Sequence, residues 1–291
     1  MMTDTDLVFV DLHTHSTASD GSRAPRDVVR AAHAIGLAAI ALTDHDTVGG
    51  LAEATDEGRA LGVRVVAGIE LSAVEGDEET HVLGLHLQNA ARLDDQLREL
   101  RAMRLTRAER IVLRLNELGV RVSLEDVLSQ SGGGAVGRPH IARALINDGW
   151  ATDMRDAFDR YLGNGRAAFV PKDRLSIGDA IAMIHDAGGL AILAHPAQSG
   201  TKKRIEALVQ FGLDGVEVRH PAHNAEDIAR LSALVEHFRL IPSGGSDWHG
   251  LAEGGRTLGM MRVPFTFLER QDLAIAERRV RADGDHEAYV A

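Results

Sequence analysis

The stretch LVFVDLHTHS, residues 7–16, places a short apolar run directly before a polar segment rich in histidine. An apolar run of this length is typical of a buried strand, which we expect from Leu7 to Leu12. The same order recurs in LAAIALTDHD, residues 37–46, and in VRVVAGIE, residues 63–70. This repetition predicts a sheet whose strands end in side chains able to bind a metal.

Helical patterns separate most of the strands. In the first third of the chain, helices are expected over residues 25–35 and 49–61, and strands over 37–42, 63–69 and 80–87. The acidic loop 75–79 is too short for a helical crossover, so the strand after it should return antiparallel. After Phe169, helices over 176–187, 204–211 and 225–238 alternate with strands over 190–193, 215–218 and 240–243. Such alternation predicts an α/β fold with a largely parallel sheet, and about seven strands suggest a closed or nearly closed barrel.

The middle of the chain has a different pattern. From about Arg92 to about Leu162 no strand is expected, and helices are predicted over 93–118, 124–128, 141–146 and 154–161. We therefore expect three parts: a first part of the barrel over residues 1–90, a helical insertion subdomain over 91–165, and a second part of the barrel over 166–291.

Composition excludes several classes of protein. Asp plus Glu number 43 and Lys plus Arg 32, for a net charge of -11, which disfavours a general duplex-DNA-binding protein. A small anionic substrate remains compatible if positive charge is concentrated locally. The chain has no Cys, so a metal would be held by His and carboxylates. The absence of an 18-residue apolar run and the acidic start MMTDTD predict a cytoplasmic protein without membrane span or signal peptide. No obligate protein partner is indicated.

The polar residues that follow the strands form a consistent set. The carboxyl ends of parallel strands share one face, where sites are usually built. His13 and His15 are two positions apart, so in an extended chain they point the same way, and Asp247 and His249 repeat this spacing. A lone His at a strand end is usually just a hydrogen-bonded polar residue, but this many together favour a metal cluster of two or three Zn, Mn or Fe ions. The nine candidate ligands are His13, His15, Asp20, His45, Glu70, His81, His195, Asp247 and His249.

Seven motifs together resemble the PHP (polymerase and histidinol phosphatase) superfamily of metal-dependent phosphoesterases. They are DLHTHS at 11–16, SDG at 19–21, TDHD at 43–46, GIE at 68–70, ETH at 79–81, AHP at 194–196 and SDWH at 246–249. The chain looks most like the nucleoside 3′,5′-bisphosphate phosphatases, some of which also act as 5′-to-3′ exoribonucleases. Asp20 and the GRPH element at 137–140 fit that branch. The resemblance implies a distorted (β/α)7 barrel with a helical insertion.

The resemblance also implies how the ligands are shared. His13, His15, Glu70 and Asp247 would hold one ion. Glu70 would bridge to a second ion, completed by His81 and His195, and a third would be held by Asp20, His45 and His249. Manganese is the expected metal, with iron or zinc as alternatives. A hydroxide on these ions would attack phosphorus, with Glu70, Asp247 and His220 as the catalytic set.

Candidate substrate contacts are mainly basic. Arg101, Arg104 and Arg107 recur every three residues on one side of the long helix. They form either a solvated face or, as the resemblance implies for Arg104 and Arg107, nucleotide contacts. Arg138 stands where Pro139 fixes the start of a helix, a position that favours anions. The remaining candidates are His140, His220 as a phosphate or proton donor, Asp20, and Asp46, which would contact a ribose or orient a ligand.

The expected activity is hydrolysis of a phosphomonoester of a small nucleotide. The preferred substrate is the 3′-phosphate of a nucleoside 3′,5′-bisphosphate, which would yield the 5′-monophosphate. The alternatives are 5′-to-3′ exonuclease action on short RNA, histidinol phosphate hydrolysis, and a non-catalytic binding module that the metals stabilise. The metal, the number of ions, base preference, oligomeric state and pathway remain open.

Overall fold

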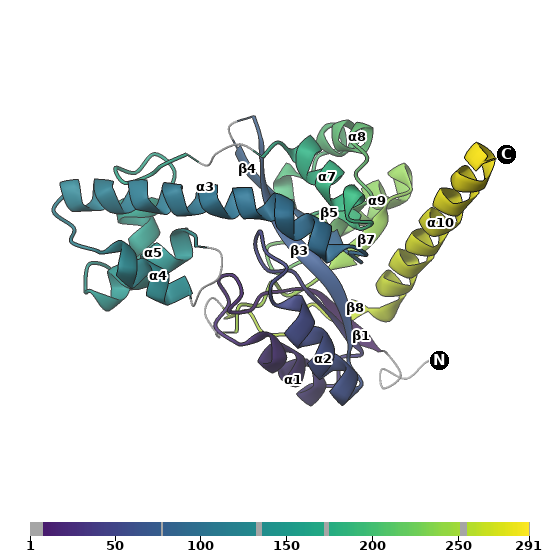
Figure 1. Cartoon of the computed structure of the whole chain (residues 1–291), viewed down its shortest axis with the longest axis horizontal. Coiled ribbons are helices and arrows are strands. Elements are labelled where there is room, and N and C mark those ends of the chain that lie inside the picture. The colour runs from purple at the N-terminus through teal and green to yellow at the C-terminus, as the bar shows by residue number, and fades with distance from the viewer. Residues whose placement is uncertain (1–7, 77, 132–135, 172–174, 251–254, 291) are drawn as a thin grey trace.

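A barrel-like sheet of eight strands forms the centre of the protein (Figure 1). The computed structural model describes residues 8–76, 78–131, 136–171, 175–250 and 255–290. The spatial order of the strands is β7-β6-β5-β4-β3-β2-β1-β8. The strands are β1 (Phe9–Thr14), β2 (Ala39–Leu42), β3 (Arg64–Glu75), β4 (Glu78–Leu85), β5 (Leu190–Leu193), β6 (Gly215–Arg219), β7 (Ile241–Gly244) and β8 (Val263–Pro264).

The strand directions place the carboxyl ends of six strands and the first residues of a seventh at the same end of the barrel, which we call the mouth. The runs β1-β2-β3 and β5-β6-β7 are each parallel, whereas β4 is antiparallel to both β3 and β5. The expected antiparallel return after the third strand is therefore confirmed. Because β4 runs in reverse, its first residues lie beside the carboxyl ends of its neighbours.

Helices on the outside of the sheet bury one apolar side each. In α7, the side chain of Ser176 accepts a hydrogen bond from the Asp179 backbone and starts the helix, and Ile181 and Ile184 are fully buried. These helices share one hydrophobic cluster with the outward-facing residues of the strands. They are α1 (Pro25–Ala34), α2 (Leu51–Leu61), α7 (Ile177–Asp186), α8 (Lys202–Gln210) and α9 (Ala225–Phe238), with a 3-10 turn at Ala197–Ser199.

The segment after β7 joins the sheet back to β1. The backbone N–H of Asp247 donates to the carbonyl of His13, and that of His15 donates to the carbonyl of Trp248, both at 2.9 Å. A Cβ on Gly245 would lie 2.4 Å from the Cβ of His13, so this close approach requires glycine. The two-residue strand β8 pairs with β1 at the opposite end. The expected barrel of about seven strands is confirmed, with a short eighth strand added.

The helical insertion has a hydrophobic cluster of its own. The first half of α3 (Ala90–Glu117) buries Leu93 and Leu97 against the barrel, and its second half buries Ile111 and Leu115 among the insertion helices. Figure 1 shows α3 extending from the barrel to α4 and α5. The buried residues of this cluster run from Ala108 to Val170, and the division near residues 91 and 165 stays a prediction. The other insertion elements are α4 (Leu124–Ser131), α5 (Arg138–Asn147), α6 (Met154–Ala157) and a π-helical turn at Phe158–Leu162.

The helix α10 (Phe265–Val290) was not among the expected elements. It lies on the side of the barrel away from the insertion (Figure 1), and its Leu268 and Ile275 belong to the cluster inside the barrel. Gln271 is fully buried between them, and its side chain bonds to His86 at 3.1 Å and to the Pro242 carbonyl at 3.4 Å. In the described part of the chain, no helix has the length and apolar character needed to cross a bilayer.

Replacing Leu268 by alanine should measure how far α10 belongs to the folded core. Leu268 is fully buried, so Leu268→Ala should lower the free energy of unfolding by about 2–5 kcal/mol. Leu273 on the same helix is 65 % exposed, and Leu273→Ala should change this free energy by less than about 0.5 kcal/mol. Urea unfolding followed by circular dichroism gives both values, and equal values would mean that α10 does not pack on the barrel.

Candidate metal centre

The barrel mouth brings all nine candidate ligands together. Most come from the ends of β1, β2, β5 and β7, and Glu70 and His81 come from within the neighbouring strands β3 and β4. Asp46, His195 and Asp247, which follow β2, β5 and β7, have positive φ angles of 49°, 30° and 51°. Such angles are strained for residues with a side chain. These three residues therefore adopt a less favourable backbone conformation at the points where the chain leaves the strands and enters the mouth.

One group consists of His13, His15, Glu70 and Asp247. The Nε2 atoms of His13 and His15 are 3.1 Å apart, and each lies within 3.4 Å of both Glu70 Oε2 and Asp247 Oδ1. Ligands bound at 2.0–2.2 Å from one ion must lie within roughly 4.4 Å of each other. These four atoms therefore fit around a single ion.

Two further groups adjoin the first. The other oxygen of Glu70, Oε1, lies 2.8 Å from His81 Nδ1 and 3.0 Å from His195 Nε2. On the opposite side, Asp20 Oδ1 is 3.2 Å from His249 Nε2, and Asp20 Oδ2 is 4.0 Å from His45 Nε2. The members of each set that the family resemblance implied lie near one another, but His15 also lies 3.7 Å from Asp20, and His45 also lies 3.3 Å from Glu70. We propose the three implied sets as the ligand sets.

Two histidines are held so that Nε2 faces the cluster with its lone pair. His13 Nδ1 donates to Glu217 Oε1 at 3.1 Å, and His249 Nδ1 donates to the Asp247 carbonyl at 3.0 Å. A proton fixed on Nδ1 leaves Nε2 able to bind a metal. Glu217 is fully buried and also accepts from the His195 backbone at 2.8 Å. It therefore orients two ligand-bearing segments at once.

His220 has the opposite arrangement. Its Nδ1 accepts a hydrogen bond from the Ala222 backbone N–H at 3.1 Å, so in the neutral ring the proton is on Nε2. That Nε2 is buried, has no hydrogen-bond partner among the described residues, and lies 3.4 Å from Asp247 Oδ2. With its proton on Nε2, His220 is suited to donate a proton or hydrogen bond at the mouth, although it also lies in a group with His13 and Glu217 that could hold a metal.

The charges of the cluster favour cations. Burial opposes the ionisation of Glu70, but the surrounding imidazoles outweigh it and hold the pKa of Glu70 well below its ordinary value. The pKa of Asp247 is lowered in the same way. Burial would lower the pKa of His15, but hydrogen bonds and charges from Asp247 and Glu70 raise it to about 10. Metal binding must therefore release protons from the cluster.

The donor set fits divalent ions. Burial lowers the pKa of His45 to about 3, so its ring is neutral at physiological pH and keeps a lone pair for coordination. The Nδ1 atoms of His15 and His45 are buried and have no hydrogen-bond partner among the described residues. Imidazole nitrogens and carboxylate oxygens suit Zn, Mn and Fe alike. The cluster is thus able to hold more than one divalent ion.

A cavity of about 160 Å³ lies between the mouth and the insertion. Three candidate metal ligands, Asp20, His45 and His81, line it together with three arginines, Arg104, Arg107 and Arg138. The expected contacts of these arginines with a nucleotide stay a prediction. Arg101 instead pairs with Asp94 at 2.9 Å and is not among the residues described as lining the cavity.

Each cavity arginine is already held by the protein. Arg104 pairs with Asp46 and donates to Ser72 Oγ at 2.7 Å, and Arg138 pairs with Glu79 at 3.0 Å. Arg107 donates to the Val170 carbonyl at 2.9 Å. Asp46 accepts from the Ser72 backbone at 2.9 Å, so it fixes Arg104 in place. Its predicted contact with a ribose stays a prediction.

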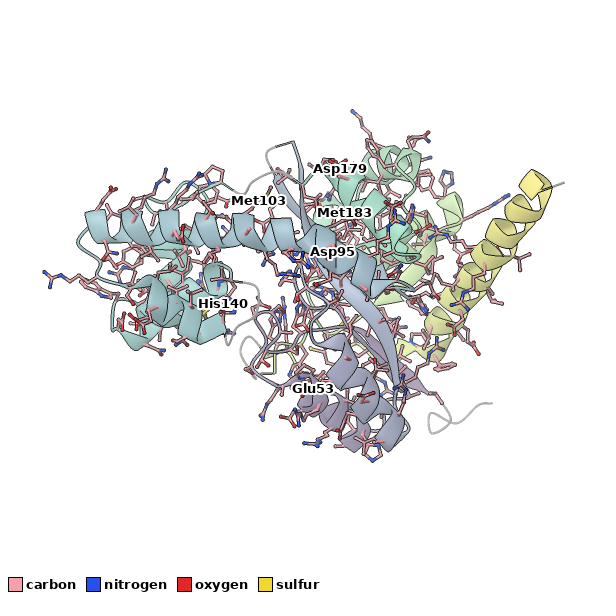
Figure 2. The ribbon with its side chains drawn as sticks, in the orientation of Figure 1. Glu53, Asp95, Met103, His140, Asp179 and Met183 are labelled. Carbon is pink, nitrogen blue, oxygen red and sulfur yellow. The ribbon has the colours of Figure 1, made fainter. Side chains whose placement is uncertain are left out.

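His140, marked on the insertion in Figure 2, joins the insertion to the barrel. Its Nδ1 accepts from the Gly137 backbone N–H, and its Nε2 donates to the Ser19 carbonyl, both at 3.0 Å. Burial lowers the pKa of His140 to about 4, so the ring stays neutral. A contact between His140 and substrate, as predicted, would require one of these hydrogen bonds to break.

Two charged neighbours of the ligands were not singled out from the sequence. Glu79 lies 3.5 Å from His81 Nε2, and Arg256 pairs with Asp247. Glu79 and His81 are two positions apart on β4, so strand periodicity could have placed both side chains on one face. Arg256 follows the sequence GLAEGG at 250–255 and carries no comparable signal.

Removal of the Glu70 carboxylate should disturb more than one ion, because its two oxygens face different ligand groups. Elemental analysis of protein stripped with chelator and reloaded with Mn²⁺ measures this. The variant Glu70→Gln should lose at least two-thirds of the metal that wild-type protein regains. Asp20→Asn should lose at most one-third, since Asp20 belongs to only one of the three proposed sets. Equal losses in the two variants would exclude Glu70 as a shared ligand.

The chain is similar to known proteins of one family. The PHP domain family matches residues 11–166. The chain is 34% identical over 257 residues to the 3′,5′-nucleoside bisphosphate phosphatase of Chromobacterium violaceum, covering 86% of this chain and 90% of that protein. It is also 34% identical over 257 residues to the 5′-3′ exoribonuclease Rnm of Escherichia coli, covering 85% and 88%.

A solved structure supports the same relationship. A metal-dependent phosphoesterase from Bifidobacterium adolescentis superposes with a TM-score of 0.84 at 31% identity, covering 90% of this chain and 94% of that one. Sequence and fold agree over nearly the whole length. The chain therefore belongs to the PHP domain family.

Proposed function

We propose that this protein is a metal-dependent hydrolase of phosphoesters that removes the 3′-phosphate from nucleoside 3′,5′-bisphosphates and releases the 5′-monophosphate. The observation that carries the proposal is the shared cavity, which three candidate metal ligands and three arginines line together. Metal ions and guanidinium groups are the two common partners of phosphate in proteins. We propose Mn²⁺ as the metal, with Fe and Zn as the alternatives that the same ligands accept.

A substrate with two phosphates can use both regions of the cavity. One phosphate would lie against the ligand cluster, and the other against Arg104, Arg107 or Arg138. Binding of the second phosphate then supplies energy that positions the first for reaction. A mononucleotide can occupy only one region, so it gains less from the arginines.

The protein's own groups would orient the reactants and handle the proton. When bound, divalent ions would neutralise phosphate charge and activate water near neutral pH. Glu70 and Asp247 would fix the relative positions of the ligand groups through their separate oxygens. We assign the leaving-group proton to His220, because the Ala222 backbone N–H leaves the ring proton on Nε2 beside Asp247.

The other candidate functions make different demands on the cavity. Histidinol phosphate carries an amine, which three guanidinium groups would repel. A non-catalytic module would need a coordinatively closed metal site, whereas this cluster adjoins a cavity. Short RNA remains compatible, because it also offers phosphates on both sides of a nucleoside.

Adenosine 3′,5′-bisphosphate should be hydrolysed with a higher kcat/KM than adenosine 5′-monophosphate. The reason is the second phosphate, which the arginines can bind. Steady-state phosphate release with added Mn²⁺, together with phosphorus NMR of the products, measures both rate and position of cleavage. Accumulation of adenosine 3′-monophosphate would reverse the proposed orientation, and equal kcat/KM values would remove the arginines as a second phosphate site.

Arg138→Ala should lower kcat/KM for the bisphosphate while leaving the metal content unchanged. Loss of a charged hydrogen bond costs about 1.5–3 kcal/mol, which is roughly a ten- to over a hundredfold loss. Arg101→Ala is the matched control, because Arg101 pairs with Asp94 away from the cavity. A kcat/KM that stays at the wild-type value in Arg138→Ala would argue against a phosphate contact at this residue.

A further inference from the structure

A cavity of about 320 Å³ lies at the end of the barrel opposite to the mouth, where β3 begins, β4 ends and α10 passes. Its polar lining consists of Arg64, His86, Gln88, Asp272 and Arg279. We propose that this cavity is a binding site for inorganic phosphate, taken up as the hydrogenphosphate dianion. None of the nine candidate metal ligands is among the residues described as lining it, so the site is separate from the one at the mouth.

Two guanidinium groups from different elements supply positive charge to the cavity. Arg64 on β3 donates to both carboxylate oxygens of Asp272, to one of them at 2.7 Å. Arg279 on α10 donates to Gln88 Oε1, which is a neutral amide oxygen. The described lining therefore has two guanidinium groups and a single carboxylate, in a chain whose net charge is -11. This local excess of positive charge favours an anion.

His86 adds a hydrogen-bond acceptor to the cavity. The side chain of Gln271 donates from Nε2 to the Pro242 carbonyl at 3.4 Å, so its Oε1 accepts from His86 Nε2 at 3.1 Å. With the proton on Nε2, the Nδ1 atom of the neutral ring keeps its lone pair. Among the described residues this Nδ1 has no hydrogen-bond partner, and Asp272 Oδ1 lies 3.7 Å from it.

The surroundings of His86 keep its ring in place and neutral. The residue is 8 % exposed and has a φ of 59°, and its carbonyl accepts from Gln88 Nε2 at 2.7 Å. Burial lowers the pKa of His86, and the nearby charges of Arg64 and Arg279 act in the same direction. The ring is therefore unprotonated at physiological pH and presents an acceptor to a ligand.

Hydrogenphosphate matches this combination of donors and acceptor. Its unprotonated oxygens can accept from the two guanidinium groups, and its P–OH group can donate to His86 Nδ1. The ligand must displace Asp272 from Arg64, and a dianion gains more from this exchange than a second carboxylate would. Sulfate has the same shape and charge but no proton, so one of its oxygens would face the Nδ1 lone pair.

Titration of Zn²⁺-loaded protein with inorganic phosphate, followed by nitrogen NMR of the histidine side chains, tests the site. Zn²⁺ is diamagnetic, and the variant His86→Asn identifies the His86 signal, because Asn tolerates a positive φ. The Nδ1 signal should shift as phosphate is added. Sulfate should bind about tenfold more weakly or worse, since it leaves the acceptor without a donor.

Two variants of the lining should change phosphate binding in opposite directions. Arg279→Ala should weaken it by about tenfold or more, because a charged hydrogen bond is lost. Asp272→Asn should tighten it by up to about fivefold, because the carboxylate that competes for Arg64 is removed. Arg270→Ala is the matched control on the same helix, since Arg270 pairs with Glu236 at 3.2 Å, and it should leave the affinity within about twofold.

The result that would overturn the site is an unshifted His86 signal at phosphate concentrations where the signals of the histidines at the mouth no longer change. Equal affinities for sulfate and phosphate, or weaker phosphate binding in Asp272→Asn, would also reject it. Arg138→Ala should leave the His86 titration unchanged, because Arg138 lines the cavity at the mouth. Failure of this site and failure of the proposed function therefore give different results.

Discussion

Glu70 is a buried carboxylate in contact with the rings of five histidines. Its Oε2 lies within 3.3 Å of His13, His15 and His45, and its Oε1 lies within 3.0 Å of His81 and His195. A buried carboxylate without partners would be strongly unfavourable, so this group depends on the ring around it. The ring in turn depends on strands that place these histidines at one mouth. The stability of the buried Glu70 carboxylate therefore depends on the same strand arrangement that brings the histidines together.

The arginines of the insertion follow the same principle. A guanidinium group near the mouth would be costly without a counter-charge, and Asp46 and Glu79 provide it for Arg104 and Arg138. The long helix α3 carries Arg104 and Arg107 between its barrel half and its insertion half. The two halves are anchored in separate hydrophobic clusters. This anchoring fixes the position of both arginines relative to the candidate metal ligands. An anionic substrate would have to replace the carboxylates at the arginines, which favours ligands with strong local negative charge.

Much of this arrangement could be predicted from the sequence, because strand ends and ligand spacing are local properties. The nine candidate ligand positions, the parallel strands and the helical insertion all follow from short patterns such as His13-Thr14-His15. The helix α10 was missed because the polar Gln271 interrupts its buried face, and its bonds to His86 and Pro242 appear only in the folded chain. Arg256 was missed for a related reason, because its pairing with Asp247 appears only in the folded chain. Glu79 was overlooked, although its spacing from His81 on β4 could have indicated it.

The junction between β1 and the segment after β7 has a consequence for how the candidate site is assembled. Asp11 Oδ1 accepts from the Ser246 backbone at 2.9 Å, across 235 positions of sequence, and the ligands on either side of this contact face the same group. A fragment that stops before Asp247 and His249 lacks candidate ligands from two of the three proposed sets. It can expose His13 and His15 but cannot complete their coordination. Metal binding to these proposed sets therefore depends on a fold that has already joined segments 235 positions apart.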